Sequence, residues 1–149
     1  MNQKIPKALT IAGSDSGGGA GIQADLKTFS ALGVHGSSVI TAITAQNTKE
    51  VTAVHNVPLD IIEKQIDAVL SDIGADAVKI GMLSNSGIIR TISKKLKNYK
   101  TKNIVFDPVM VAASGAKLLE DSAIASLKKE LIPLALIITP NIPEAQVLV

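Results

Sequence analysis

The sequence predicts an α/β fold in which a mostly parallel central sheet is flanked by helices. Short apolar runs typical of strands alternate with segments whose apolar residues recur every three or four positions, as in amphipathic helices. The strand-like runs are almost continuously apolar, which is expected when helices cover both faces of a sheet. The 149 residues contain no repeat, low-complexity tract or linker, so we expect a single domain over residues 1–149.

The first part of the chain predicts strand, helix and strand. Residues 8–12 form a short apolar run, and the apolar residues from Ile22 to Phe29 then fall at helical spacing, with Gly33 as a C-terminal cap. Residues 38–45 are rich in Val, Ile and Thr and therefore indicate a strand. Residues 51–57 alternate only in part, which leaves an edge strand or a flap as alternatives.

The middle of the chain predicts helix, strand and helix. Apolar residues of segment 59–73 repeat at intervals of three and four and indicate a helix. Residues 77–80 indicate a strand, and segment 88–96 has the spacing of a second helix. We expect Ser84 or Ser86 to cap that helix, because serine side chains accept hydrogen bonds from the first backbone N–H groups.

The last part predicts strand, helix and strand. Residues 104–106 form a short apolar run, and the apolar residues of segment 124–131 have helical spacing. Asp121 is expected to cap this helix and Pro133 to stop it. Residues 134–138 are expected to form the final strand.

Composition excludes several classes of protein. Hydrophobic residues make up 46% of the chain, the formal net charge is +2 and aromatic residues make up 2%, which argues against disorder and against a nucleic-acid binder. With no cysteine, the chain cannot form disulfides or thiolate zinc sites, nor use a cysteine nucleophile. No apolar run approaches the ~20 residues of a membrane span, and residues 1–7 lack the apolar stretch of a signal peptide. We expect a soluble, cytoplasmic protein.

Residues unsuited to a core follow each expected strand. They are the glycine-rich segment 13–21, then Gln46, Met82, Asp107 and Asn141. The carboxyl ends of parallel strands meet at one edge of an open α/β sheet and form its ligand crevice. The sequence therefore predicts a binding site where these residues converge.

The glycine-rich segment lies between a strand and a helix, where free backbone N–H groups attract anions. It lacks the Lys-Ser or Lys-Thr of a P-loop, and the third position of a dinucleotide fingerprint falls on Ile22. Asp15 also stands where a nucleophile elbow requires serine. With four glycines in five positions, the segment indicates close backbone approach to a ligand, and a tight turn is the alternative.

Each candidate polar residue has a functional and a structural interpretation. The amide of Gln46 could bind an amino-substituted heterocycle, and the structural alternative is that it faces water. The thioether of Met82 could pack on a flat ring, and the structural alternative is that it fills the core. Asp107 suits Mg²⁺ or a phosphate network, or a turn. Asn141 and Glu144 would share a helix face that suits a water-rich Mg²⁺ site, whereas their spacing alone favours a capping box.

Five segments resemble the hydroxymethylpyrimidine/phosphomethylpyrimidine kinases, in the order and with the spacing of that family. They are residues 12–25, 44–47, 79–83, 107–110 and 139–145. The resemblance implies a ribokinase-like fold and a homodimer. It also implies that ATP and Mg²⁺ are used to phosphorylate 4-amino-5-hydroxymethyl-2-methylpyrimidine and then its monophosphate, in thiamine diphosphate biosynthesis.

The resemblance implies two groups of site residues. The substrate-binding residues would be Gly13, Ala20, Gln46, Met82 and Val109. The residues that organise Mg²⁺ and phosphates would be Asp107, Asn141 and Glu144.

Members of this family continue well past the position of Val149. The resemblance implies that the nucleotide site and the catalytic base lie in that further sequence, so we expect a fold incomplete at its C-terminus and a chain that is inactive alone. Two alternatives are a truncated, non-catalytic pyrimidine-binding module and a pyridoxal- or pyridoxine-type vitamin kinase. An uncovered sheet edge would also favour association.

Overall fold

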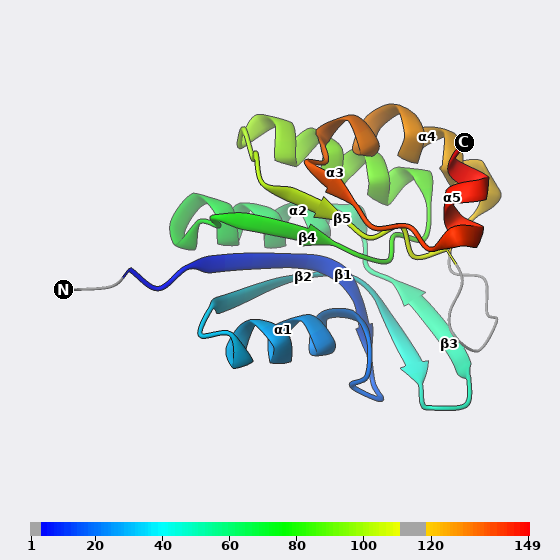
Figure 1. The fold of residues 1–149 in the computed structure, drawn as a ribbon, viewed down its shortest axis with the longest axis horizontal. Helices are drawn as coiled ribbons and strands as arrows, with labels where there is room; N and C mark the ends of the chain where they lie inside the picture. Colours follow the sequence, from blue (N-terminus) through cyan, green and yellow to red (C-terminus); the bar gives the residue numbers. More distant parts are fainter. Residues whose placement is uncertain (1–3, 111–118) are drawn as a thin grey trace.

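The computed structural model describes residues 4–110 and 119–149, which form a six-stranded sheet with the order β3-β2-β1-β4-β5-β6 (Figure 1). The strands are β1 (Lys7–Asp15), β2 (His35–Gln46), β3 (Val51–Asn56), β4 (Ala77–Ile80), β5 (Ile104–Phe106) and β6 (Ile137–Ile138). β2 and β3 pair antiparallel, and the other described pairs are parallel. The prediction of a mostly parallel sheet is confirmed.

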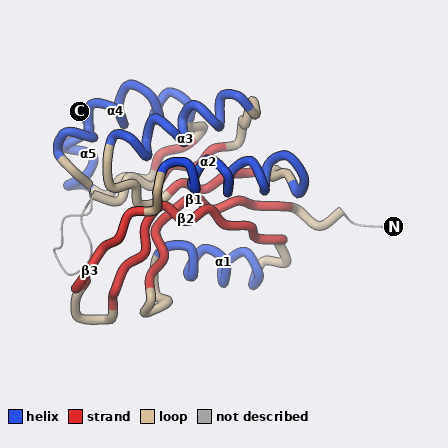
Figure 2. The backbone as a smooth tube through the Cα atoms, turned by 180° about the vertical axis from the view of Figure 1, so that it is seen from behind, coloured by secondary structure: helices blue, strands red, loops and turns tan. Residues whose placement is uncertain are grey.

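Helices lie on both sides of this sheet. They are α1 (Gly21–Ala31), α2 (Leu59–Ala68), α3 (Ser86–Asn98), α4 (Ile124–Ser126) and α5 (Ile142–Leu148). Figure 2 shows α1 on one face of the sheet and α2, α3 and α4 on the other. Further helical turns extend α2 over Val69–Ile73 and surround α4 over Asp121–Ala123, Leu127–Leu131 and Ile132–Leu134.

The main core lies between the sheet and α2 and α3. Apolar side chains of α3 point to the sheet every three or four residues, and Ile88, Ile89, Ile92 and Leu96 are at most 1% exposed. Strands β4 and β5 contribute Ile80 and Phe106 to the same core cluster. The helical spacing of segment 88–96 therefore has the cause inferred for it, a single buried face.

The edge strand β6 is covered less completely than the apolar strands predict. α1 packs against β1 and β2, whereas Ile137 and Ile138 of β6 are 52% and 41% exposed. The expectation that helices bury both faces of every strand is wrong for β6 in the part of the chain described. Consequently the sheet ends in an apolar, accessible edge.

Several expected boundaries differ from those observed. Segment 51–57 is an edge strand rather than a flap, because β3 pairs with β2. Pro133 does not stop the fourth helix, since helical turns continue to Leu134 as a 3₁₀ turn that accommodates proline near its start. The last strand is therefore only Ile137–Ile138, not residues 134–138.

The expected helix caps have mixed outcomes. Gly33 follows the C-terminus of α1 with a φ of 70°, as a glycine cap requires. For α3, however, the cap is neither Ser84 nor Ser86: the Oδ1 atom of Asn85 accepts a hydrogen bond of 3.0 Å from the N–H group of Ile88. The side chain of Asp121 lies outside the described structure. Within residues 4–110 and 119–149, no helix combines the length and apolarity needed to cross a membrane.

Candidate active site

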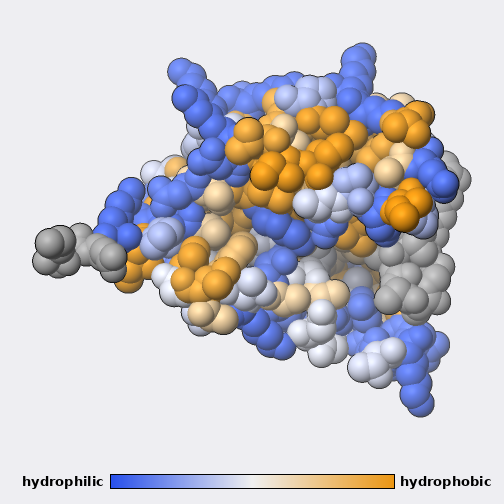
Figure 3. Space-filling model, in the orientation of Figure 1, coloured by the Kyte–Doolittle hydropathy of each residue, from blue (hydrophilic) through white to orange (hydrophobic). Residues whose placement is uncertain are grey.

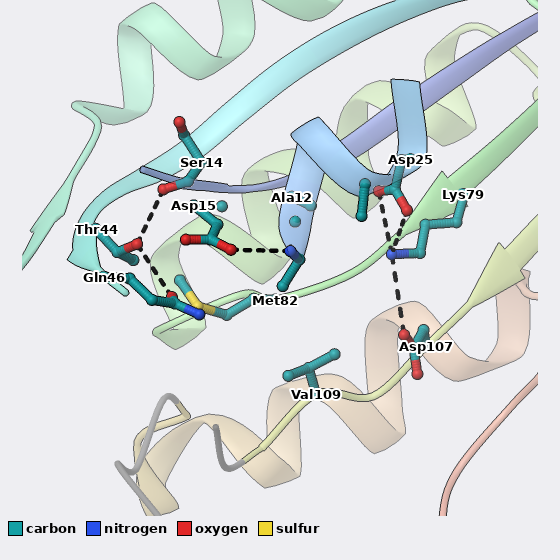
Figure 4. Close-up of a pocket in the computed structure, with 14 residues that line it drawn as sticks. Ala12, Ser14, Asp15, Asp25, Thr44, Gln46, Lys79, Met82, Asp107 and Val109 are labelled. Atoms are coloured by element: carbon teal, nitrogen blue, oxygen red, sulfur yellow. Dashed lines mark hydrogen bonds and ion pairs between the residues drawn. The ribbon is translucent and has the colours of Figure 1, made fainter. Parts of the chain in front are cut away.

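A cavity of about 330 Å³ opens at the carboxyl ends of the parallel strands. Six of the eight predicted site residues line it: Gly13, Ala20, Gln46, Met82, Asp107 and Val109. Figure 4 shows Gln46 and Met82 together at one end of this cavity, Asp107 at the other, and Val109 between them. The structure thus brings together side chains from four chain segments, as the strand order requires.

The glycine-rich loop is held by a carboxylate of the chain itself. Asp15, only 5% exposed, accepts hydrogen bonds from the backbone N–H groups of Gly17, Gly19 and Ala20 at 2.7, 2.9 and 2.9 Å. The expectation that these N–H groups are free to attract an external anion is therefore wrong in this conformation. The loop shapes the cavity wall instead.

Glycine is required where the loop enters α1. Gly21 has a φ of 56°, and a Cβ atom at this position would lie 2.2 Å from the carbonyl oxygen of Gly13. Such a distance excludes any side chain without backbone movement. The loop therefore approaches the end of β1 closely, and the cavity keeps its shape.

Gln46 is fixed at the end of β2 through backbone and side chain. The Ser16 hydroxyl donates to the carbonyl oxygen of Gln46 at 2.7 Å, and the N–H group of Gln46 donates back to that hydroxyl at 2.8 Å. The Thr44 hydroxyl has two acceptors, the Ser14 carbonyl oxygen at 3.0 Å and Gln46 Oε1 at 3.2 Å. The amide is thereby oriented beside Met82 (Figure 4).

Apolar groups form the cavity wall next to this amide. Met82 is 8% exposed, and its carbonyl oxygen accepts a hydrogen bond of 3.0 Å from the Thr41 hydroxyl. A Cβ atom at Gly13 would lie 3.0 Å from Met82 Cε. The thioether and the glycine backbone therefore leave room for a flat ring rather than a bulky group.

The far end of the cavity is charged. Lys79 Nζ of β4 lies 3.2 Å from both carboxylate oxygens of Asp25 in α1, and 3.9 Å from Asp107 Oδ2. Burial raises the pKa of Asp107, Lys79 opposes this effect, and the charge of Glu144 adds to it. The cavity thus combines a neutral end that suits a heterocycle with an end where charges are concentrated.

Residues 15–149 match the sequence profile of the family described as phosphomethylpyrimidine kinase. The chain belongs to this family. A hydroxymethylpyrimidine/phosphomethylpyrimidine kinase of Rhizobium meliloti is 62% identical over 138 residues, which are 93% of this chain and 52% of the relative.

Two solved structures place the fold among ribokinase-like vitamin kinases. Phosphomethylpyrimidine kinase from Clostridium difficile is 63% identical with a TM-score of 0.89, over 96% of this chain and 62% of that one. Pyridoxal kinase from Staphylococcus aureus, in complex with AMP-PCP and pyridoxal, is 39% identical with a TM-score of 0.85, over 98% and 52%. The chain spans about half the length of the curated relatives it matches.

Two residues that the resemblance to phosphomethylpyrimidine kinases implicates do not line the cavity. Asn141 and Glu144 form a capping box at α5: Asn141 Oδ1 accepts from the N–H group of Glu144 at 2.9 Å, and Glu144 Oε2 accepts from that of Asn141 at 3.0 Å. The structural alternative for this pair is thus realised. Glu144 nevertheless acts on the site, because its charge raises the pKa of Asp107.

The carboxylates near the cavity could hold Mg²⁺ only if waters and phosphates supplied most of its ligands. No group of three or more metal-ligating side chains occurs within residues 4–110 and 119–149. Mg²⁺ in phosphoryl-transfer sites is commonly held by one or two carboxylates together with waters and substrate phosphates. Asp107 and Glu144 supply two carboxylates whose mutual repulsion a cation would relieve.

Sequence reasoning assigned no role to Asp15, Asp25 or Lys79. A signal for Asp15 was present, since aspartate side chains often bond to the backbone two residues further on. Lys79 also stands out as the one charged residue of the short strand β4, between buried Val78 and Ile80. Its partner Asp25 is 54 residues away in the sequence, so local spacing carries no signal for the pair.

Proposed function

We propose that this chain forms the pyrimidine-binding part of an ATP-dependent kinase of thiamine biosynthesis, with 4-amino-5-hydroxymethyl-2-methylpyrimidine and its monophosphate as substrates. The observation that carries the proposal is the cavity itself, in which one oriented amide and an apolar wall face a charged end. The names of the relatives support the substrate class, and the bound AMP-PCP of a structural neighbour supports the use of ATP.

In this proposal the neutral end of the cavity binds the heterocycle. The Gln46 amide, which offers donors and an acceptor, pairs with the exocyclic amine and the adjacent ring nitrogen. Met82 and Val109 pack against the ring, and Gly13 and the Ala20 backbone close the wall around it. The hydroxymethyl group then points toward Asp107.

In this proposal the charged end of the cavity binds the phosphates. When bound, ATP supplies the phosphoryl group and Mg²⁺ neutralises its charge. In the first transfer the hydroxyl oxygen of the substrate forms a bond to the γ-phosphorus, the bond from that phosphorus to ADP breaks, and the hydroxyl proton passes to a base. In the second transfer an oxygen of the monophosphate is the nucleophile, and ADP leaves in the same way. We assign Asp107 and Glu144 to the cation and phosphates, and Asn141 to holding Glu144. No residue of this chain is assigned as the base.

Calorimetric titration of the aminopyrimidine into the purified chain tests the binding step. Gln46→Ala removes hydrogen bonds from the substrate and is expected to weaken binding at least about tenfold, the equivalent of one to two hydrogen bonds. Thr48→Ala, in the same β2–β3 connection but outside the cavity lining, serves as the matched control. Equal affinities of Gln46→Ala and the unchanged chain would overturn the assignment.

A pyridoxal-type kinase is the second candidate, since several neighbours at 39–43% identity are pyridoxal kinases. Titration of the same chain with pyridoxal separates the two. We expect weaker binding of pyridoxal than of the aminopyrimidine, and the reverse order would assign the chain to the second class.

Catalysis is tested separately from binding. Incubating the purified chain with the aminopyrimidine, ATP and Mg²⁺ is expected to give no phosphorylated product. Product formation would rule out the alternative of a non-catalytic binding module and would require a base within these 149 residues.

A further inference from the structure

Lys79 occupies an unusual position in the cavity. Among the described residues that line it, Lys79 is the one with a positive charge, and the ionisable side chains around it are the carboxylates Asp15, Asp25 and Asp107. Asp15 is already committed to three backbone N–H groups. A phosphate that enters this cavity therefore has a single side-chain cation to meet and would otherwise face carboxylates.

The two carboxylates near Lys79 hold it unequally. Both oxygens of Asp25 lie 3.2 Å from Nζ, and Asp25 is itself fixed by a 2.6 Å hydrogen bond from the Thr10 hydroxyl. Asp107 Oδ2 is 3.9 Å away, beyond hydrogen-bonding distance. Asp25 thus holds the ammonium on one side. Because an ammonium has three N–H donors, it can still donate to a ligand on its other side.

The backbone leaves room for this arrangement. A Cβ atom at Gly81 would lie 2.9 Å from Lys79 Nζ and 3.1 Å from Ala12 Cβ. Because Gly81 has no side chain, the lysine can fold back along the sheet, where its side chain is only 25% exposed. Its ammonium thereby reaches the charged end of the cavity, opposite the end that holds Gln46 (Figure 4).

We propose that Lys79 binds a phosphate group at the charged end of the cavity, and that Asp25 is the positioning residue that holds its ammonium there. The proposal rests on the proposed function and names the group that recognises the phosphate. That phosphate is either the ester of the monophosphorylated pyrimidine or the terminal phosphate of the nucleotide. Both present the same dianionic oxygens to the ammonium.

Calorimetry on the full chain tests this with three ligands. They are the unphosphorylated aminopyrimidine, its monophosphate, and AMP-PCP with Mg²⁺ added to the pyrimidine-saturated chain. Lys79→Met keeps an unbranched side chain that is one atom shorter, and removes the charge. We expect it to weaken a phosphate-bearing ligand at least about tenfold more than the unphosphorylated one, as for loss of one charge-assisted hydrogen bond. The ligand that is weakened identifies the source of the phosphate.

Three further variants separate recognition from stability. Lys79→Arg keeps the charge and is expected to recover most of the phosphate preference, even if Lys79→Met folds poorly. Gly81→Ala displaces the ammonium without removing it and is expected to lower the same preference. Lys95→Met removes a lysine that is 16% exposed and paired with Asp67 at 2.7 Å, remote from the cavity, and is expected to leave the preference unchanged.

The outcomes are distinct. If the unchanged chain prefers neither phosphorylated ligand, or if Lys79→Met weakens all ligands equally, the role of Lys79 is overturned while the proposed function stands. If the unchanged chain binds no pyrimidine at all, the proposed function fails and the inference fails with it.

Discussion

At the scale of single residues, Asp15 determines the shape of the glycine-rich loop. Its carboxylate accepts from the N–H groups of Gly17, Gly19 and Ala20 and is almost fully buried. Asp15→Ala is expected to lower the free energy of unfolding by about 2 kcal/mol, because three loop N–H groups lose their hydrogen bonds to a buried, charged acceptor. Urea denaturation measures this change.

Asp60→Ala is a suitable control for the Asp15 substitution, because it removes an exposed carboxylate paired with Lys64 and should change stability much less. If the two substitutions had the same effect, Asp15 would not be the residue that holds the loop.

Asp107 is expected to make the chain's stability depend on pH. Burial raises its pKa in the folded chain above the ordinary value, so its contribution to stability is largest below about pH 4 and declines as pH rises through the folded pKa. Asp107→Asn should therefore stabilise the metal-free chain at pH 7. Urea denaturation in EDTA at pH 7 and pH 3 measures the difference, which should vanish at the lower pH.

The contrary result for Asp107 is also clear. If Asp107→Asn destabilised the chain at pH 7, the attraction to Lys79 at 3.9 Å would outweigh the cost of burial. In that case the charged carboxylate of Asp107 would stabilise the folded chain rather than destabilise it.

At the scale of elements, the start of α3 shows what local sequence spacing cannot resolve. Ser84 has the right residue type for a cap, but its hydroxyl donates to Asn56 Oδ1 at 2.7 Å, 28 residues away. Asn85 accepts from the N–H group of Ile88 instead. Asn85→Ala is expected to cost about 1 kcal/mol of unfolding free energy, measured by thermal or urea denaturation.

Ser86→Ala is the matched control for the cap of α3, since Ser86 is the first residue of the helix and is expected to change stability by less than about 0.5 kcal/mol. A larger loss for Ser86→Ala than for Asn85→Ala would show that the predicted serine cap operates in solution.

The regular elements are the part of the fold that periodicity predicts well. β4 and β5 have the predicted bounds, because their apolar runs are short, continuous and buried in one core. The last strand is shorter than predicted because Leu134 belongs to a 3₁₀ turn. In that turn Leu134 packs against the core, a contact that its residue type alone does not predict. Apolar segments near an element boundary fit either structure until their neighbours are known.

Some residues of the candidate site could be predicted from the sequence, and others could not. Strand order alone predicts that Gln46, Met82 and Asp107 meet, since Gln46 ends β2 and the other two closely follow β4 and β5. The roles of Asp25 and Lys79 could not be predicted, because their contact joins α1 to β4 and depends on the room left at Gly81. Functional side chains that depend on long-range pairing are the part that sequence spacing misses.

At the scale of the whole molecule, an apolar area surrounds the open edge of the sheet. Leu136, Ile137 and Ile138 are 67%, 52% and 41% exposed, and Ile142 of α5 is 78% exposed. Figure 3 shows hydrophobic residues gathered on this face, over the region of β6 and α5 in Figure 1. An exposed apolar edge strand favours pairing with another chain.

Self-association through this edge is a testable consequence. Ile137→Lys places a charge on β6 and is expected to reduce the concentration-dependent increase in sedimentation coefficient. Leu32→Lys adds the same charge at another exposed apolar residue, 72% exposed and next to α1, and should have little effect. Equal association of both variants would place the contact between copies elsewhere.

We propose above that the cavity at the carboxyl ends of the strands binds the aminopyrimidine. Two-dimensional ¹H–¹⁵N NMR of the chain during titration with this compound tests it most directly. We predict saturable shifts centred on Gly13, Ala20, Gln46 and Met82. Shifts confined to the second cavity, around Gly74 and Lys100 at the opposite end of the sheet, or no shifts at millimolar ligand, would contradict the account.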